Sequence, residues 1–210
     1  MNEHPAARFL LHPLGACLAA IARLSTTRAN GLAGMICDVG ISLALVAAAL
    51  WRGDVRVMTA LAIVAAGLLL FSFVEYCFHR WLFHAHAGAL ERGHSKHHAE
   101  PLGYDALPFF LPPLVAVGLT ALLAQALPTS IAMLLVGAVA GGYASYGVAH
   151  TAIHQLRFGS ALSRRWAALH HIHHHHPGYN FGVTTPLWDI VLGTRYVSSS
   201  RAPSVRGHAP

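Results

Sequence analysis

The sequence predicts an all-α integral membrane protein with four transmembrane helices and a histidine-rich helical cap on the cytoplasmic side. Three observations lead to this expectation. Apolar residues make up 55% of the 210 residues and charged residues only 10%, which is unusual for a soluble globular protein. The apolar residues gather into long blocks, and most of the histidines lie at or beyond the ends of those blocks.

Four apolar blocks have the length expected of membrane helices. Each is close to the ~20 residues that a helix needs to cross ~30 Å of hydrocarbon. Short loops, 52–56 and Pro128-Thr129, join the blocks in pairs, so the members of each pair must run antiparallel. The predicted helices are Leu32–Trp51, Val57–Phe78, Leu107–Leu127 and Ser130–Ala149.

The positive charges predict how these helices are oriented. Only Arg52 and Arg56 lie in the hairpin loops, and the other twelve of the fourteen Lys and Arg residues lie in the N-terminal arm, the middle segment and the C-terminal segment. By the positive-inside rule, both termini and the histidines face the cytoplasm, and we expect a multi-pass protein of a bacterial inner membrane. The net charge of +6 suits anionic lipid headgroups, and no motif predicts a nucleic acid partner.

Three segments are predicted along the chain. Residues 1–30 are expected to form an N-terminal interfacial segment, because five apolar residues fall on one helical face. Residues 31–197 are expected to form the membrane domain, and residues 198–210, rich in Ser, Pro and Arg, a disordered tail. The apolar residues of the interfacial face are Leu10, Leu14, Cys17, Leu18 and Ile21.

Thirteen of the seventeen histidines lie in four short clusters on the predicted cytoplasmic side. Spacings of three and four residues return a side chain to the same helical face, so three clusters can each present their imidazoles together. The first cluster has a spacing of five, which misses by ~140° and predicts a bend, a helix end or ligation from two sides. The candidate ligands in the four clusters are His79 and His84; His94, His97 and His98; His150 and His154; His170, His173 and His174.

Ten histidines in this order predict a metal site, because neutral imidazole is the commonest metal ligand in proteins. One metal takes four to six ligands, so ten ligands imply two metals. Cys17, Cys37 and Cys77 have no ligand spacing and no carboxylate recurs at a fixed spacing. These features argue against iron–sulfur clusters, calcium, magnesium and carboxylate-rich di-iron sites, and leave iron, zinc and copper open. In the last cluster, His171, His174 and His175 form a second HxxHH pattern.

From Phe73 to Thr194 the sequence resembles the membrane-bound fatty acid hydroxylase and sterol desaturase superfamily. The motifs that carry the resemblance are EYCFHRWLFH, HSKHHAEPLGYDALPFFLPP, YGVAHTAIH and HHIHHHHPGYNFGVTTPLWDIVLGT. In this family the last His pair lies six residues before an Asn-Phe-Gly sequence, which selects His173 and His174 here. The Tyr before His150 and the Asp and Pro residues after His98 are most similar to the fatty acid 2-hydroxylase branch.

The resemblance implies a cofactor, a reaction and partners. It implies two iron ions, which zinc can replace in purified protein, with O2 as co-substrate and no catalytic group beyond the metal ligands. The expected reaction is hydroxylation of an acyl chain or lipid taken from the membrane. The chain lacks the fused cytochrome b5 domain of eukaryotic 2-hydroxylases, so the electrons should come from a separate cytochrome b5-like or ferredoxin-like protein.

Some alternatives stay open at this level. The same ligands would serve a sterol, carotenoid or other lipid hydroxylase or desaturase, and a membrane metal transporter is the reading from another class. Behind the ligands, Glu75, Asp189 and Asn180 are candidates for orienting imidazole N–H groups, although Asp189 is equally well explained as a turn or cap residue.

Overall fold

The structure is a computed structural model, and it describes residues 15–16, 19–84, 88–104 and 106–198. Within these ranges the chain is helical and has no strand, which confirms the predicted all-α class. Most of the predicted interfacial face and residues 199–210 of the predicted tail lie outside the described residues. The helices are α2 Arg28–Trp51, α3 Val57–Cys77, η1 Phe78–Phe83, α4 Ala89–Ala99, α5 Leu111–Leu123, α6 Thr129–Gln155, α7 Ala161–His175 and α8 Leu187–Val191.

Three helices are long and apolar enough to cross a membrane. They are Arg28–Trp51, Val57–Phe83 (α3 continued by η1) and Thr129–Gln155. The predicted third helix, Leu107–Leu127, is shorter than expected, since α5 has only 13 residues. Prolines at the start of α5 fit only the first turn of a helix, and residues 124–126 form turns before Pro128. The chain is therefore a membrane protein, and its described part has three apolar helices long enough to span a membrane and one shorter apolar helix, α5.

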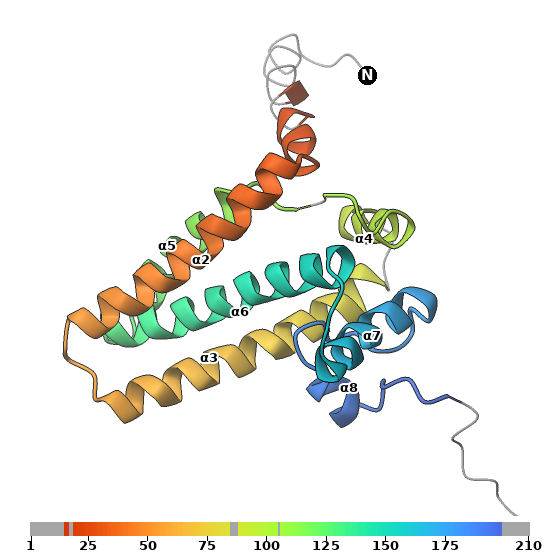
Figure 1. The fold of residues 1–210 in the computed structure, drawn as a ribbon. Coiled ribbons are helices and arrows are strands. Elements are labelled where there is room, and N and C mark those ends of the chain that lie inside the picture. Colours follow the sequence, from red (N-terminus) through yellow and green to blue (C-terminus); the bar gives the residue numbers. More distant parts are fainter. Residues whose placement is uncertain (1–14, 17–18, 85–87, 105, 199–210) are drawn as a thin grey trace, which may run out of the picture.

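Helix α6 lies at the centre of the bundle, with α2 and α3 on its two sides (Figure 1). Contacts along its length show that α2 and α6 run antiparallel. Ser42 Oγ donates to the carbonyl of Gly137 at 2.8 Å, and Met35, closer to the start of α2, lies against Gly147. Glycine allows the helices to approach closely, because a Cβ on Gly142 would lie 2.5 Å from the ring of Phe71 on α3.

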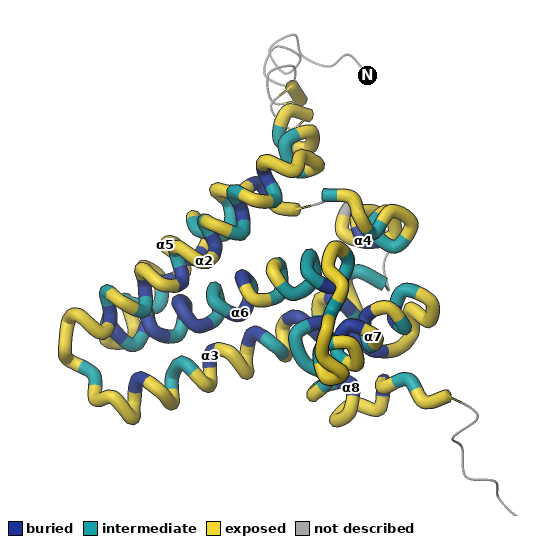
Figure 2. Tube along the Cα trace, viewed as in Figure 1, coloured by how far each residue is buried: buried dark blue, intermediate teal, exposed yellow. Residues whose placement is uncertain are grey.

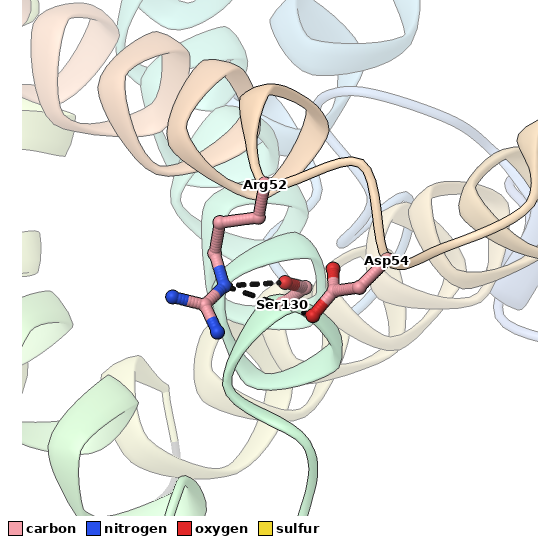
Figure 3. A network of polar contacts seen from close by, with 3 residues as sticks. All are labelled: Arg52, Asp54 and Ser130. Atoms are coloured by element: carbon pink, nitrogen blue, oxygen red, sulfur yellow. Dashed lines mark hydrogen bonds and ion pairs between the residues drawn. The ribbon is translucent and has the colours of Figure 1, made fainter.

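Both hairpin turns lie at one end of the bundle, and a side-chain contact joins them. Arg52 Nε donates to Ser130 Oγ at 3.0 Å and lies 3.7 Å from Asp54 Oδ2 (Figure 3). At the opposite end, Asn30 of α2 holds the segment before α5. Its side chain donates to the carbonyl of Leu107 and accepts from the N–H of Phe109, both at 2.9 Å. Each end of α2 is thus tied to the second helical hairpin.

The outer faces of α2 and α3 are exposed over most of their length (Figure 2). Large apolar side chains occupy these faces, among them Ile36, Leu43 and Leu61. A continuous apolar surface of this extent is expected where lipid surrounds a protein. The remaining helices, η1, α4, α7 and α8, lie with their connecting loops at the end away from the hairpin turns (Figure 1). We call this region the cap.

Candidate metal centre

The cap brings the ten predicted histidines together in two groups of five. Within each group the candidate ligand atoms all lie within 4.8 Å of one another, so each group can hold a metal ion. We call them group one and group two. Group one contains His79, His84, His94, His98 and His173; group two contains His97, His150, His154, His170 and His174.

The two groups are assembled by the same rule. Each takes two histidines from the end of a membrane-spanning segment, an i, i+4 pair from one cap helix and a single histidine from the other cap helix. Thus α4 gives His94 and His98 to group one and His97 to group two. Helix α7 does the reverse, because His173 alone joins group one. The repeated HxxHH spacing therefore supplies one pair and one crossing ligand per helix.

A π-helix accounts for the unusual spacing of His79 and His84. Residues Phe78–Phe83 form one π-helical segment that ends at His84. In a π-helix the hydrogen bonds join residues five apart, so a spacing of five lies on one face. The two imidazole rings are stacked with centroids 5.3 Å apart. The predicted departure from a straight α-helix is confirmed, and its form is a change of helix type rather than ligation from two sides.

The Nε2 atoms of group one lie closer together than hydrogen bonds between neutral imidazole rings can explain. The Nε2 of His94 lies 3.0 Å from that of His79, 2.9 Å from that of His84 and 3.0 Å from that of His98. A neutral ring nitrogen is either one donor or one acceptor, so it cannot satisfy three others. A cation at the centre of the group would accept all of these lone pairs.

The separations also fit metal coordination. Two nitrogens at right angles on a metal with ~2.1 Å bonds lie about 3.0 Å apart, whereas tetrahedral ligands lie about 3.4 Å apart. In group two, the Nε2 of His170 lies 3.0 Å from that of His154 and 3.1 Å from that of His174. The two groups therefore fit more than four ligands per metal, unlike a structural zinc site.

Group two also contains buried ring nitrogens that lack a partner. Within the described residues, the Nε2 atoms of His97 and His150 are buried and accept or donate no hydrogen bond. Buried polar atoms without partners are rare and costly, and at functional sites they commonly mark an absent ion. These atoms support a metal at group two independently of the distances.

The cap imidazoles are held in their neutral form, which is the form that binds metals. Burial and, to a smaller extent, neighbouring imidazoles together lower the pKa of His94 to about 2 and that of His97 to about 4. Burial likewise lowers the pKa of His174 to about 2. At pH 7 these side chains present lone pairs rather than charges, so the cap is prepared for a cation.

Backbone carbonyls fix the orientation of two group-one rings. His79 Nδ1 lies 2.5 Å from the carbonyl oxygen of Phe181, and His173 Nδ1 lies 2.7 Å from that of Tyr179. A carbonyl can only accept, so each Nδ1 carries the hydrogen and each Nε2 keeps its lone pair for the metal. The loop after α7 thus selects the tautomer of both rings.

Buried carboxylates hold this loop rather than the imidazoles. Asp189 accepts from the N–H groups of Phe181 and Gly182, each at 2.8 Å, and from the Thr194 hydroxyl at 2.7 Å. Glu75 accepts from the N–H of Val183 at 2.6 Å and from the N–H and hydroxyl of Thr184.

Asn180 completes the loop. It adopts a left-handed φ of 54°, which Asn tolerates better than most residues, and its side chain bridges Leu169 and Tyr196. In the structure the hydrogen bonds of Glu75, Asp189 and Asn180 do not reach imidazole N–H groups, and for Asp189 they fit the alternative of a turn residue. Their hydrogen bonds run to the backbone and side chains of the loop, because those donors lie nearer than the rings. They act on group one through the carbonyls of the loop.

The structure distinguishes the two histidine patterns of α7. His170 and His173 are almost fully buried, with 1% and 0% of their surface exposed, and His174 lies beside them in group two. His171 and His175 are exposed and belong to neither group. The placement favours the pattern His170, His173 and His174.

Several residues that shape the centre were not identified from the sequence. Tyr76 is fully buried, shares a hydrogen bond with Thr194 and accepts one from Arg80. Gly182 has no room for a side chain, because a Cβ would overlap the carbonyl oxygen of Thr185. Tyr179 and Phe181 contribute carbonyls, which no sequence pattern marks. The signal available for Gly182 was its position in the stretch NFGVTTPLWDIVLGT, and for Tyr76 its position in EYCFHRWLFH.

Relatives whose activity is named match up to two thirds of the chain. A dihydroceramide fatty acyl 2-hydroxylase of Arabidopsis thaliana is 31% identical over 156 residues, which cover 67% of this chain and 62% of that protein. The fatty acid 2-hydroxylases of Rattus norvegicus and Homo sapiens are 30% identical over 145 residues, 61% of this chain and 38% of theirs. The chain thus spans less than two thirds of the length of these relatives. All three relatives are named as 2-hydroxylases, which confirms the predicted resemblance to the 2-hydroxylase branch.

The fold has a counterpart among solved structures. The hydroxylase domain visible in a structure of full-length Scs7p superposes with a TM-score of 0.69 and 22% identity, covering 83% of this chain and 69% of that one. At this identity the match shows the fold alone. The family model for fatty acid hydroxylases matches residues 64–194, which is more than half of the chain and includes all of the segment identified by its motifs. The chain therefore belongs to the fatty acid hydroxylase family.

Proposed function

We propose that the chain is a membrane-bound di-iron monooxygenase that hydroxylates an acyl chain or lipid. In this reaction one C–H bond, O2, two electrons and two protons give one C–OH group and one molecule of water. The single observation that carries the proposal is the pair of five-histidine groups at the end of the apolar helices. The names of the relatives, which describe fatty acyl and fatty acid 2-hydroxylases, support an acyl substrate.

The ten histidines would hold the cofactor, five to each iron ion. When bound, a pair of iron ions supplies the oxygen activation needed to break an unactivated C–H bond, which side chains alone cannot do. The non-tetrahedral spacing of the Nε2 atoms supports iron over structural zinc, although zinc can occupy the same nitrogens in purified protein.

The chain's own residues position the ligands and control access. His79 and His173 donate their Nδ1 hydrogens to Phe181 and Tyr179, which aims both Nε2 atoms at the centre of group one. Burial of His79 and His173 keeps water from these nitrogens. The substrate would enter from the bilayer, because the groups lie where the apolar helices end.

We further propose the placement of the centre and its electron source. The cap and both termini face the cytoplasm, with α5 as a short fourth membrane helix, since the hairpin loops carry only two of the fourteen cations. Electrons come from a separate cytochrome b5-like or ferredoxin-like protein. The exposed cations Arg92 of α4 and Arg195 beyond α8 would suit an acidic donor surface.

Comparative lipid mass spectrometry of host cells with and without the chain tests the proposal. Cells that make the chain should contain acyl species heavier by one oxygen atom, with the oxygen position given by fragmentation. His98→Ala, which removes a member of group one, should abolish these species. His175→Ala is the matched control, since His175 is exposed and outside both groups.

The other outcomes point to named alternatives. Species lighter by two hydrogen atoms would identify a desaturase with the same centre, and an oxygenated sterol or carotenoid would identify another lipid hydroxylase. Unchanged lipids beside a changed cellular metal content would overturn the proposed function in favour of metal transport.

A further inference from the structure

A groove lies between α2 and α6, beside the centre described above. Its volume is about 520 Å³, within the range of small-molecule sites in proteins. Most of its lining is apolar, and the helices that form it are apolar enough to span a membrane. Representative lining residues are Val39, Leu43, Gly141, Val148, Ala152 and Trp166.

The groove runs from the middle of the bundle to the cap. Because α2 and α6 are antiparallel, Leu43 and Gly141 lie together at the end nearer the hairpin turns. Ala152 and Trp166 form the other end, and the distance along α6 between Gly141 and Ala152 is about 16 Å. Trp166 is one helical turn before His170 on α7. Ala152 is two residues from both His150 and His154, so the cap end is close in sequence to these members of group two as well.

Charge differs between the two ends. Asp38, next to the lining residue Val39, is only 8% exposed, and its Oδ1 has no hydrogen-bond partner in the described part of the chain. An anionic headgroup placed at this depth would meet an unpaired carboxylate and no water. The cap end is flanked in sequence by exposed arginines instead, since Arg157 follows α6 and Arg164 and Arg165 come just before Trp166 on α7.

We propose that this groove binds the hydrocarbon tail of the acyl substrate, with the polar head toward the cap. The inference rests on the proposed function and adds the place and direction of the substrate. Lipid surrounds these helices, so a tail can enter from the side without crossing water. The end at Leu43 then limits the length of acyl chain that fits.

Photolabelling of the purified full-length chain tests the groove without requiring turnover. The probe is a fatty acid with a diazirine at its methyl end, in vesicles of phosphatidylcholine and phosphatidylglycerol. Labels should map to α2 and α6 around Leu43 and Gly141. A second hollow of about 350 Å³, between α3, α6 and residues 184–187, includes Leu68 and Leu69 in its lining. Labels at Leu68 and Leu69, or spread evenly over all outer faces, would overturn the proposal.

A matched pair of variants tests the length limit. Leu43→Trp fills the far end of the groove, and Leu114→Trp on α5 is the control, because both leucines are 64% exposed and Leu114 lines neither hollow. Both sites face outward, so folding should be unaffected. Leu43→Trp should weaken labelling by probes long enough to reach the far end of the groove relative to shorter probes, and shift products to shorter chains.

The two proposals fail in different ways. If the chain labels as expected but makes no oxygenated lipid, the groove stands and the proposed function does not. If it makes oxygenated lipid, and Leu43→Trp matches Leu114→Trp in both labelling and product length, the groove is wrong while the proposed function stands.

Discussion

The two histidine groups contain the same number of ligands but are held in place differently. In group one, the carbonyls of Phe181 and Tyr179 accept hydrogen bonds from two ring nitrogens, and Asp189 fixes the loop that carries them. In group two, the Nδ1 of His170 is buried without a partner in the described part of the chain. Packing replaces hydrogen bonds there, since the ring of Tyr146 stacks on His150 with centroids 5.5 Å apart.

This difference concerns how firmly each group is shaped before a metal arrives. A ring fixed by a hydrogen bond at its far nitrogen cannot rotate or change tautomer without breaking that bond. A ring that is held only by packing can rotate or change tautomer without breaking a hydrogen bond. We therefore expect group one to bind its metal more tightly than group two and to depend on the loop, whereas group two should depend on the packing of α6 and α7.

Removing one ligand from each group should give the largest effects. His94→Ala deletes the Nε2 that lies within 3.0 Å of three others, and His150→Ala deletes a buried ligand of group two. Each variant should lose about one of two metals per chain and lower activity by more than roughly a hundredfold. Metal analysis of the purified variants beside product analysis checks both expectations. Two metals retained in either variant would remove that histidine from the centre.

The spacing of the histidines made much of this centre predictable. Residues four apart share a helical face, and the pairs 94/98, 150/154 and 170/174 each remain within one group. The sequence could not predict that His97 and His173 cross to the other group. That division depends on how α4 and α7 face each other in the folded cap, which is a tertiary property.

The residues behind the ligands were harder to predict. Carbonyls at Tyr179 and Phe181 act as acceptors, but every residue has a carbonyl, so composition gives no signal. Glu75 and Asp189 were identified as candidates, but closeness in sequence to the histidines could not show that their hydrogen bonds run to the loop, a role that was left open only for Asp189. Apolar composition also overestimated the length of α5, since turns near Pro128 can be as apolar as a helix.

Asp189→Ala should affect the two groups unequally. The substitution leaves the N–H groups of Phe181 and Gly182 without their acceptor, which costs about 1–3 kcal/mol for each buried group. The loop should shift and release His79 and His173, lowering metal affinity at group one by roughly 10- to 100-fold while group two changes little. Metal titration of the metal-free protein should therefore show the tighter site of the parent chain weakened toward or below the affinity of the other site. An equal loss at both groups would contradict the comparison.

Acidification should destabilise the metal-free cap before the bundle. The folded pKa values of His84, His97 and His173 lie near 4, 4 and 3, below the unfolded value near 6.5. As the pH falls below 6.5 the unfolded chain takes up protons that the folded cap refuses, so stability falls by at most ~1.4 kcal/mol per pH unit for each such histidine. The contribution of these neutral histidines to the stability of the folded cap is fully present above pH 6.5.

The readout is limited proteolysis of the cap beside far-ultraviolet circular dichroism of the helices, between pH 7 and pH 4. Cleavage in the cap should rise below pH 6.5 while the signal of the long helices persists. Bound metal should delay this cleavage to lower pH, because protons and metal compete for the same nitrogens. Simultaneous loss of both signals at every metal content would show that the cap and bundle unfold as one unit.

The smallest effects are expected at the exposed histidines of α7. His171 and His175 would replace His170 and His173 as ligands if the alternative HxxHH pattern held, but they are exposed and outside both groups. The double variant His171→Ala, His175→Ala should keep two metals and change activity less than about twofold. Both side chains are exposed, and substitutions at exposed positions outside a metal site usually alter stability by under ~0.5 kcal/mol. The paired variant His170→Ala, His173→Ala removes one ligand from each group and should lose both metals. A reversed result would assign the other pattern, and with it a rotation of α7 that turns His173 away from the carbonyl of Tyr179.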